Sequence, residues 1–269
     1  MITGTFPSRL KYALIKPIFK NGDKKKVANY RPISLLPSFS KILEKIMYSR
    51  LTNYVVTNNI LAQEQCGFRP SSSTELASFN IINNILNELQ KKNIVGGIFL
   101  DLQKVFDCVN HDILLNKLHS YGVTGGFFKL IKTFLQNRYQ RVVLNNNYSN
   151  LVSEWGKTTH GVPQGLILGP LLFLLYLNNL PSLIDNNNKI VLFVDDTSLI
   201  ISNPDPINFR KDANKILQHI QKWFDTNSIS LNWEKTYFMY FLTKNNSFND
   251  FDIMYKDKKV TTVDNIKFL

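Results

Sequence analysis

The chain has 269 residues, 44% apolar and 19% charged, a balance that excludes a disordered protein and provides for a buried core. Its 32 Lys and Arg against 20 Asp and Glu leave a net charge of +12, which fits a polyanionic partner and equally a solvated basic surface. With only two cysteines, Cys66 and Cys108, a disulfide scaffold is excluded, and the four histidines have no cysteine partners at the spacing of zinc ligands, which disfavours a zinc site.

No signal peptide opens the chain, and the longest apolar run, residues 166–177, is too short to span a bilayer. We therefore expect an intracellular protein without a membrane partner.

The first third of the chain predicts one strand and two helices. A short apolar strand over residues 14–19 is followed by a turn at Gly22-Asp23. A helix starting near Ser38 or Ser40 follows, with apolar positions at helical spacing: Ile42, Ile46, Leu51, Tyr54 and Val55. A second helix starts at a capping box, Ser72 to Glu75, and its predicted core-facing stripe is Leu76, Phe79, Ile82, Leu86 and Leu89.

The rest of the chain alternates strands with helices. Strands are predicted over residues 95–102, 141–144, 190–194 and 237–242, with a hairpin around Asp257-Lys258. Helices are predicted over residues 111–121, 126–137, 166–180 and 206–226, the last with an apolar face of Phe209, Ala213, Ile216, Ile220 and Trp223. This order favours an α/β or α+β sheet packed on helices.

Three aspartates stand at the ends of apolar strands. Asp101 closes the strand at 95–102, and Asp195-Asp196 closes the strand at 190–194. If these strands are neighbours, the three carboxylates meet at one edge, where Mg²⁺ relieves their repulsion. Two such ions about 4 Å apart can activate a hydroxyl nucleophile and neutralise a leaving pyrophosphate. An isolated Asp-Asp pair, in contrast, more often only starts a turn.

Further motifs surround these aspartates in a fixed order. The runs are FLDLQKVFD (99–107), GVPQG (161–165), LGPLLF (168–173) and FVDDT (193–197), preceded by PIFKNGD (17–23), NYRPISLL (29–36), SKILEK (40–45) and QCGFRP (65–70). Trp223, Asn227, Leu231-Asn232 and Lys235-Thr236 follow them. Together these blocks resemble the reverse transcriptase domain of non-LTR (LINE, Jockey-like) retrotransposons, over nearly the whole chain.

The resemblance implies an α+β right-hand polymerase, with fingers over residues 1–94 and a palm over 95–269. The palm's antiparallel sheet packs on helices, fingers elements are inserted at about 111–160, and the thumb is missing. It implies RNA-directed DNA synthesis by two-metal nucleotidyl transfer, with RNA template, DNA primer and deoxynucleotides as partners. The cofactor would be two Mg²⁺ ions, with Mn²⁺ as a substitute, in a nuclear or cytoplasmic ribonucleoprotein.

The same resemblance assigns roles to single residues. Asp101, Asp195 and Asp196 would be the catalytic metal ligands, with the carbonyl of Leu102 as a further ligand. The nucleotide would be contacted by six residues: Arg31 and Lys20 at the triphosphate, Phe106 against a 2′-hydroxyl, Gln164 and Gly165 at the base pair, and Lys235 at the pyrophosphate. Trp223, on the apolar stripe, is expected in the core.

Several positions depart from the family pattern. Leu166 replaces the usual Ser, Val194 and Val105 replace Ala, and Asn179 replaces Asp. Two alternatives therefore stay open. One is a catalytically decayed relic that acts at most as a nucleic-acid-binding module, and the other is a different palm enzyme such as an RNA-templated RNA polymerase or a group II intron maturase.

Overall fold

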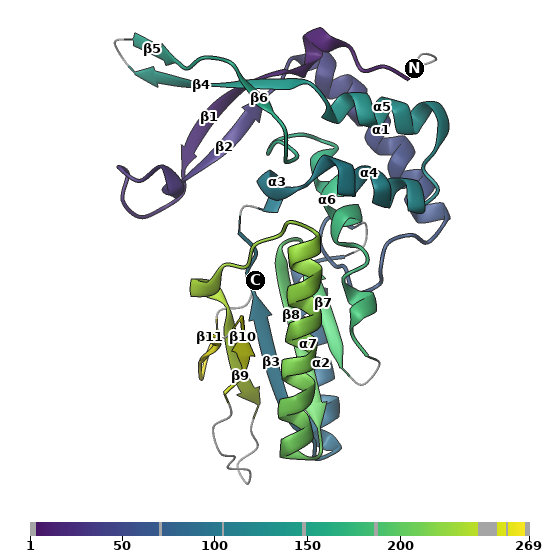
Figure 1. The fold of residues 1–269 in the computed structure, drawn as a ribbon, viewed down its shortest axis with the longest axis vertical. Coiled ribbons are helices and arrows are strands. Elements are labelled where there is room, and N and C mark those ends of the chain that lie inside the picture. The colour runs from purple at the N-terminus through teal and green to yellow at the C-terminus, as the bar shows by residue number, and fades with distance from the viewer. Residues whose placement is uncertain are drawn as a thin grey trace. The chain divides into compact units, whose positions relative to one another are not determined.

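The computed structural model describes residues 4–69, 72–103, 105–146, 149–185, 188–241, 252–256 and 258–266. The chain forms two compact units, each made from two separate stretches of sequence (Figure 1). Unit 1 comprises residues 1–60 and 106–176, and unit 2 comprises residues 61–105 and 177–269. In this division residues 61–94 belong to the second unit, and the fingers–palm boundary at residue 94 stays a prediction.

Unit 1 combines a five-stranded sheet with helices. Its strands are β1 (Tyr12–Phe19), β2 (Tyr30–Leu35), β4 (Arg138–Asn146), β5 (Ser149–Val152) and β6 (Gly156–Thr158). Its α-helices are α1 (Ser38–Thr57), α3 (Val105–Cys108), α4 (His111–Ser120), α5 (Gly125–Leu135) and α6 (Gly169–Leu177), and α3 and α6 each extend one residue into unit 2. Short 3₁₀ turns, η1 (Ser8–Lys11) and η2 (Val27–Asn29), precede β1 and β2.

The sheet of unit 1 is mixed rather than purely antiparallel. Its order is β2-β1-β4-β5, with β6 also paired to β4. β1 runs parallel to β4, and the remaining pairs are antiparallel. β1 and β4 are far apart in sequence, so backbone hydrogen bonds between these strands connect the two stretches of chain that form unit 1.

Helix α1 has the predicted position, and of its predicted apolar positions Leu51 and Val55 are buried. Its buried residues are Ser40, Glu44, Met47, Leu51 and Val55. Two residues of the predicted apolar face, Ile42 and Ile46, are instead 55% and 40% exposed. The buried face of α1 can include the carboxylate of Glu44 because hydrogen-bond donors inside unit 1 pair with it.

Unit 2 is a second five-stranded sheet with two long helices. Its strands are β3 (Ile94–Leu100), β7 (Lys189–Phe193), β8 (Asp196–Asn203), β9 (Tyr237–Phe241) and β12 (Thr261–Thr262), and β10 (Met254–Tyr255) pairs with β11 (Lys258–Lys259) as a separate hairpin. The helices are α2 (Thr74–Gln90) and α7 (Pro206–Thr226), with 3₁₀ turns η3 (Pro181–Leu183) and η4 (Trp233–Lys235). The hairpin lies where the sequence predicts it, although Asp257 itself is outside the described residues.

The unit 2 sheet has the order β12-β9-β3-β8-β7, antiparallel except for β12 beside β9. Strand β3 is buried along its whole length, as its apolar run predicts. Strand β8 is not among the predicted strands. It begins at Asp196, the second residue of the Asp-Asp pair, and lies between β7 and β3, so the two predicted strands are not direct neighbours.

Helices α2 and α7 cover opposite faces of this sheet, with α7 in front and α2 behind in Figure 1. Val95 packs in one cluster with Ala77, Ile81 and Ile85 of α2. The next residue, Gly96, points the other way, where an added Cβ would lie 2.7 Å from the ring of Phe209 on α7. Because successive strand residues face opposite sides, these contacts define two cores, one on each face.

The predicted stripe of α2 is the wrong face of that helix. Ala77, Ile81 and Ile85 are buried, whereas Leu76, Phe79, Ile82 and Leu86 are 42%, 63%, 56% and 51% exposed. The helix also starts one residue later than the capping box predicts, with Ser73 accepting a hydrogen bond from the N–H of Leu76. Both faces carry apolar residues at helical spacing, so periodicity alone did not select the buried one.

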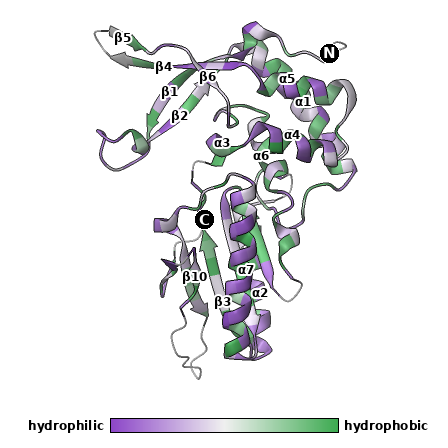
Figure 2. Ribbon diagram, viewed as in Figure 1, coloured by the Kyte–Doolittle hydropathy of each residue, from purple (hydrophilic) through white to green (hydrophobic). Residues whose placement is uncertain are grey.

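Helix α7 confirms its prediction in bounds and in face. Phe209, Ala213, Ile216, Ile220 and Trp223 are all buried, which places Trp223 in the core as expected. Figure 2 shows the opposite side of this helix as largely hydrophilic. Within the described ranges, none of the helices combines the length and the apolar character that a membrane span requires.

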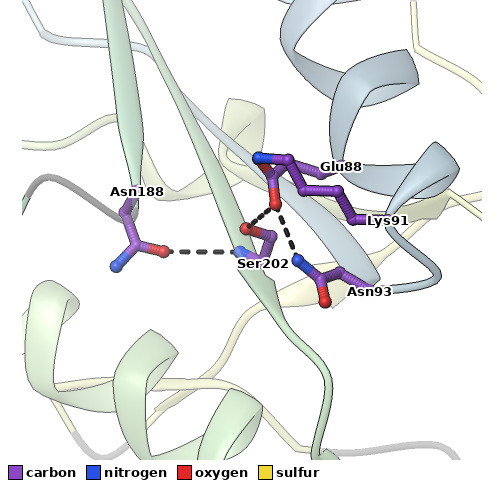
Figure 3. Close-up of polar contacts among 5 residues, drawn as sticks. All are labelled: Glu88, Lys91, Asn93, Asn188 and Ser202. Carbon is purple, nitrogen blue, oxygen red and sulfur yellow. Dashed lines mark hydrogen bonds and ion pairs between the residues drawn. The ribbon is translucent and has the colours of Figure 1, made fainter.

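A polar network fixes the C-terminal end of α2 to the sheet of unit 2 (Figure 3). The Glu88 carboxylate accepts hydrogen bonds from Lys91 Nζ at 2.6 Å, Asn93 Nδ2 at 2.7 Å and Ser202 Oγ at 2.9 Å. Asn188 Oδ1 accepts from the N–H of Ser202 at 3.3 Å. Burial raises the pKa of Glu88, but the hydrogen bonds outweigh it and leave the pKa below its ordinary value. The network lies at the end of β8 remote from Asp196.

Candidate active site

The carboxylates of Asp101, Asp195 and Asp196 lie at one end of the unit 2 sheet. Strand β3 ends at Leu100, which pairs with Thr197 of antiparallel β8. Asp101 and Asp196 are therefore the next residues outward on neighbouring strands. Asp195 belongs to the two-residue turn between β7 and β8, since Phe193 pairs with Asp196. The structure thus brings the three aspartates together, through β8 rather than through a direct contact of β3 with β7.

Electrostatics at this end of the sheet disfavour three ionised carboxylates. Burial raises the pKa of Asp196 to about 6, with further upward contributions from Asp195 and Asp101, and only Lys235 opposes the shift. Lys235 Nζ lies 3.9 Å from Asp101 Oδ2. This is a site of unbalanced negative charge made of hard oxygen donors, which is the donor set that Mg²⁺ prefers.

The oxygen donors of Asp101, Asp195 and Asp196 suit divalent ions, although their side chains are not arranged as a complete set of metal ligands. In the part of the chain that the structure describes, no three His, Cys, Asp or Glu side chains are already grouped as metal ligands. Leu102, the predicted carbonyl ligand, is buried and pairs with Leu231 in an isolated bridge. The carbonyl groups that accept hydrogen bonds in this bridge are those of Asp101 and Ser230, not that of Leu102.

Asn232 is a residue whose role the sequence reading missed. Its Nδ2 donates to Asp101 Oδ2 at 2.6 Å, and its backbone N–H donates to the carbonyl of Asp101 at 2.8 Å. These two bonds fix both the backbone and the carboxylate of Asp101. The run that contains Asn232 and Lys235 was recognisable in the sequence, but only the fold shows that it reaches Asp101.

The turn that carries Asp195 has an unusual backbone. Val194 adopts a φ of +59°, which is an outlier for a β-branched residue. Two-residue hairpin turns require such a conformation at their first position. Holding a valine there costs about 1–3 kcal/mol, which surrounding contacts must offset.

The predicted triphosphate contacts are in unit 1. Arg31 lies on β2 and pairs with Ile18 of β1, and Lys20 follows β1, its N–H donating to the carbonyl of Asn29 at 2.9 Å. Both side chains are exposed. The two residues therefore lie on adjacent segments of one β-hairpin, where their charges can act together.

Phe106 lies on the short helix α3 of unit 1. Its ring is half-buried and packs against Phe173 of α6, with ring centroids 4.9 Å apart. The backbone carbonyl of Phe106 accepts a hydrogen bond from Val162 N–H at 2.7 Å. Phe106 is thus supported by α6 and by the loop that carries Gln164.

Besides the bond from Val162 to Phe106, further hydrogen bonds fix the loop at residues 161–168 within unit 1. The N–H of Gly161 donates to the carbonyl of Val109 at 2.7 Å, and His111 Nε2 lies 2.8 Å from the carbonyl of Gly161. The carbonyl of Gln164 accepts from Ser34 N–H at 2.8 Å. At the far end, Ile167 N–H donates to the carboxylate of Glu44 at 3.0 Å.

Gly165 is required in this loop by its backbone. Its φ of +97° lies in the left-handed region, and an added Cβ would lie 3.1 Å from the carbonyl oxygen of Ser34. Gln164, next to it, lines an open cavity of about 540 Å³. The cavity is lined by Arg141 and Lys157 and also by Asp107 and Glu154, so it offers polar groups and charges of both signs to a ligand.

A right-hand polymerase is the class that this fold defines. A solved structure of apo telomerase from Candida tropicalis superposes with a TM-score of 0.60 at 16% identity, over 88% of this chain and 52% of that one. Telomerase from Candida albicans, in complex with a fragment of telomeric RNA, gives a TM-score of 0.57 at 15% identity, over 92% and 44%. At this identity the likeness concerns the fold alone, and it confirms the expected α+β fingers-and-palm class.

The sequence matches the family described as reverse transcriptase (RNA-dependent DNA polymerase) over residues 22–269. The chain therefore belongs to the reverse transcriptase family, and its relatives place it with the non-LTR retrotransposon members. It is 30% identical over 238 residues to the probable RNA-directed DNA polymerase from transposon BS of Drosophila melanogaster. It is 29% identical over 239 residues to the RNA-directed DNA polymerase from mobile element jockey of the same species. Each match covers 86% of this chain and 26% of the relative, so the chain spans about a quarter of their length.

Proposed function

We propose that this chain is the fingers-and-palm part of an RNA-directed DNA polymerase that extends a DNA primer on an RNA template. The observation that carries the proposal is the convergence of Asp101, Asp195 and Asp196 at one end of the unit 2 sheet. Family membership supports the same reaction. Neither a zinc-type site nor a disulfide scaffold fits the composition.

The residues around the carboxylates have distinct tasks in this reaction. Asn232 holds the Asp101 carboxylate in one orientation, and the β7–β8 turn presents Asp195 beside Asp196. Two Mg²⁺ ions, or Mn²⁺ in their place, held by these three aspartates would activate the primer hydroxyl and neutralise charge on the leaving pyrophosphate. Lys235, exposed and 3.9 Å from Asp101, can deliver a proton or positive charge to the pyrophosphate.

The nucleotide contacts in unit 1 remain part of the proposal. Arg31 and Lys20 bind the triphosphate through their charges, because a guanidinium matches phosphate oxygens bidentately. Gln164 and Gly165 approach the base pair, and Phe106 excludes a 2′-hydroxyl. The anchored loop at 161–168 supports these roles, since a contact to a base pair needs a fixed backbone.

Primer extension tests the proposal directly. The purified chain is given an RNA template, a DNA primer, deoxynucleotides and Mg²⁺, beside an Asp195→Ala/Asp196→Ala variant. We expect extension by the wild type and none by the variant. The matched control is Asp252→Ala, which removes an exposed carboxylate paired with Lys259 and should extend like the wild type.

Two other results of the primer-extension experiment would contradict the proposal. If the wild type does not extend the primer but binds RNA in a salt-sensitive way, the polymerase proposal fails for this chain. The result then favours a decayed relic that acts only as a nucleic-acid-binding module. Extension that is equal in the double variant would instead contradict the assignment of the carboxylates.

A further inference from the structure

Residues 64–67, part of a motif with no role in the preceding proposal, run alongside strand β7. The N–H of Cys66 donates to the carbonyl of Leu192 at 2.7 Å, and the N–H of Leu192 donates to the carbonyl of Glu64 at 2.9 Å. Gln65 thereby forms a parallel bridge with Leu192. Since β7 is the edge strand of the sheet, this segment covers the edge next to the turn that carries Asp195.

The Gln65 side chain reaches from this segment to the turn itself. Its Oε1 accepts a hydrogen bond from the N–H of Gly67 at 2.8 Å and another from the N–H of Val194 at 3.3 Å. Gln65 is only 2% exposed, so water does not readily replace these bonds. The acceptor thus binds the residue whose backbone has the positive φ and which directly precedes Asp195.

Gly67 lies close to the backbone of Val194, which is possible because glycine has no side chain. A Cβ at this position would lie 2.4 Å from the backbone nitrogen of Val194 and 3.1 Å from its Cα. The nitrogen is backbone rather than the end of a flexible side chain, so any larger residue must displace the turn. Two residues of one short segment therefore act on Val194, one by a hydrogen bond and one by close packing.

We propose that Gln65 is a positioning residue that holds the Val194-Asp195 turn in its left-handed conformation and so sets the place of the Asp195 carboxylate. Gly67, which has no Cβ, allows the 64–67 segment to approach the turn closely. The inference rests on the proposed function for its consequence in catalysis, but the contact itself does not. Without the acceptor, the turn is free to relax, and the carboxylates at the sheet end lose their fixed spacing.

The first experiment measures the turn and needs no activity. Gln65→Met keeps the length of the side chain and removes the acceptor, and Gln63→Met makes the same change at an exposed neighbour. In selectively ¹⁵N-valine-labelled protein, we expect the Val194 amide to exchange roughly tenfold faster in Gln65→Met than in the wild type or Gln63→Met. Unchanged exchange at Val194 would overturn the inference.

The second experiment measures the consequence for cation binding and catalysis. Mn²⁺ binding is followed by electron paramagnetic resonance of the free ion, and primer extension is measured as a function of Mg²⁺ concentration. For Gln65→Met we expect weaker Mn²⁺ binding, a higher Mg²⁺ midpoint and a roughly tenfold lower kcat, with the KM for deoxynucleotide unchanged. If Gln65→Met does not fold, Gly67→Ala is measured in the same way.

The outcomes separate this inference from the proposed function. Faster exchange at Val194 with unchanged Mn²⁺ binding and kcat overturns the positioning role while leaving the polymerase intact. A wild type that binds Mn²⁺ but does not extend, with weaker Mn²⁺ binding in Gln65→Met, supports the positioning role and overturns the polymerase. A wild type that binds no Mn²⁺ overturns the metal-site assignment, whereas exchange at Val194 still decides whether Gln65 holds the turn.

Discussion

The ring of Phe106 packs against the ring of Phe173, with centroids 4.9 Å apart, and Phe106 is half-buried. A ring that is backed by α6 cannot easily move aside for an additional oxygen on a sugar. We expect Phe106→Ala to accept ribonucleotides at least about tenfold better relative to deoxynucleotides, since one small group more or less in an apolar pocket changes discrimination by about 1–3 kcal/mol. The measurement is the ratio of kcat/KM for a ribonucleotide and the matching deoxynucleotide.

Phe39→Ala is the control for this prediction. Phe39 is also in unit 1 but is 73% exposed, so its removal should leave the sugar preference unchanged. An unchanged preference in Phe106→Ala would assign this ring to the core alone.

Lys117 is a half-buried cation on α4. Its Nζ donates to the carbonyl of Tyr176 and lies 4.8 Å from the centre of the Tyr176 ring. Burial lowers the pKa of Lys117 from 10.5 to about 7. The unfolded chain therefore binds one more proton than the folded chain between pH 7 and 10.5, and stability must rise with pH across that window.

Replacing this lysine tests the sign of that effect. We expect Lys117→Met to be more stable than the wild type near pH 7, because no charge is desolvated on folding. The advantage should shrink as the pH rises toward 10, where the unfolded wild type also loses its proton. Urea unfolding at pH 7, 8.5 and 10 measures it, and a difference that is constant with pH would contradict the lowered pKa.

At the scale of elements, α1 contributes a buried carboxylate to the loop at 161–168. Glu44 is fully buried, and its carboxylate accepts hydrogen bonds from Ser40 Oγ at 3.2 Å and Ile167 N–H at 3.0 Å. Burial raises the pKa of Glu44, while these donors and the charge of Arg138 oppose the rise. Burial likewise lowers the pKa of the Arg138 guanidinium to about 10, and Glu44 opposes that shift. Each charge thus compensates the other inside unit 1.

The pair predicts strong non-additivity. Glu44→Met leaves Arg138 buried without this compensating charge and Ile167 N–H without its acceptor, and should therefore destabilise the chain. The double variant Glu44→Met/Arg138→Met should be less destabilised than that single variant, because both charges are then absent. Urea unfolding of the four proteins closes the cycle, and a double variant whose destabilisation equals the sum of the two single ones would show that the charges do not interact.

Three helices show what sequence patterns can decide at this scale. The periodicity located α1, α2 and α7, and it chose the buried face correctly in α7. It failed in α2, where Ala77, Ile81 and Ile85 are buried and the larger apolar residues are exposed. Ala77 fits close to the sheet because it is small, a condition that depends on the strands opposite and is absent from the helix's own sequence.

At the scale of the whole molecule, each compact unit is assembled from two stretches of chain that are distant in sequence. Basic residues are more numerous than acidic ones, giving a net charge of +12. If this charge binds nucleic acid, affinity depends on the release of counterions from phosphates. The loop after β1 contains Lys24, Lys25 and Lys26, all exposed, and is a natural place for such contacts.

We expect RNA affinity to fall steeply with salt, by about 10³-fold between 50 and 200 mM if six phosphates are contacted. Lys24→Ala/Lys25→Ala/Lys26→Ala should lower the slope of log K against log salt by about 2–3. The control is Lys256→Ala/Lys259→Ala, which removes two lysines already paired with Asp225 and Asp252. Fluorescence anisotropy of labelled RNA measures the slopes, and equal slopes in all three proteins would exclude this loop.

The sequence by itself determined the family, most of the elements and the strand-end positions of Asp101 and the Asp195-Asp196 pair. These features depend on local order along the chain, which periodicity and short motifs record directly. Only the tertiary structure showed that β8 lies between β3 and β7, that Asn232 holds Asp101, and that Gln65 reaches Val194. The two side-chain contacts join residues more than a hundred positions apart, and the place of β8 depends on strand order. Patterns within a single sequence carry no information about which distant segments pair.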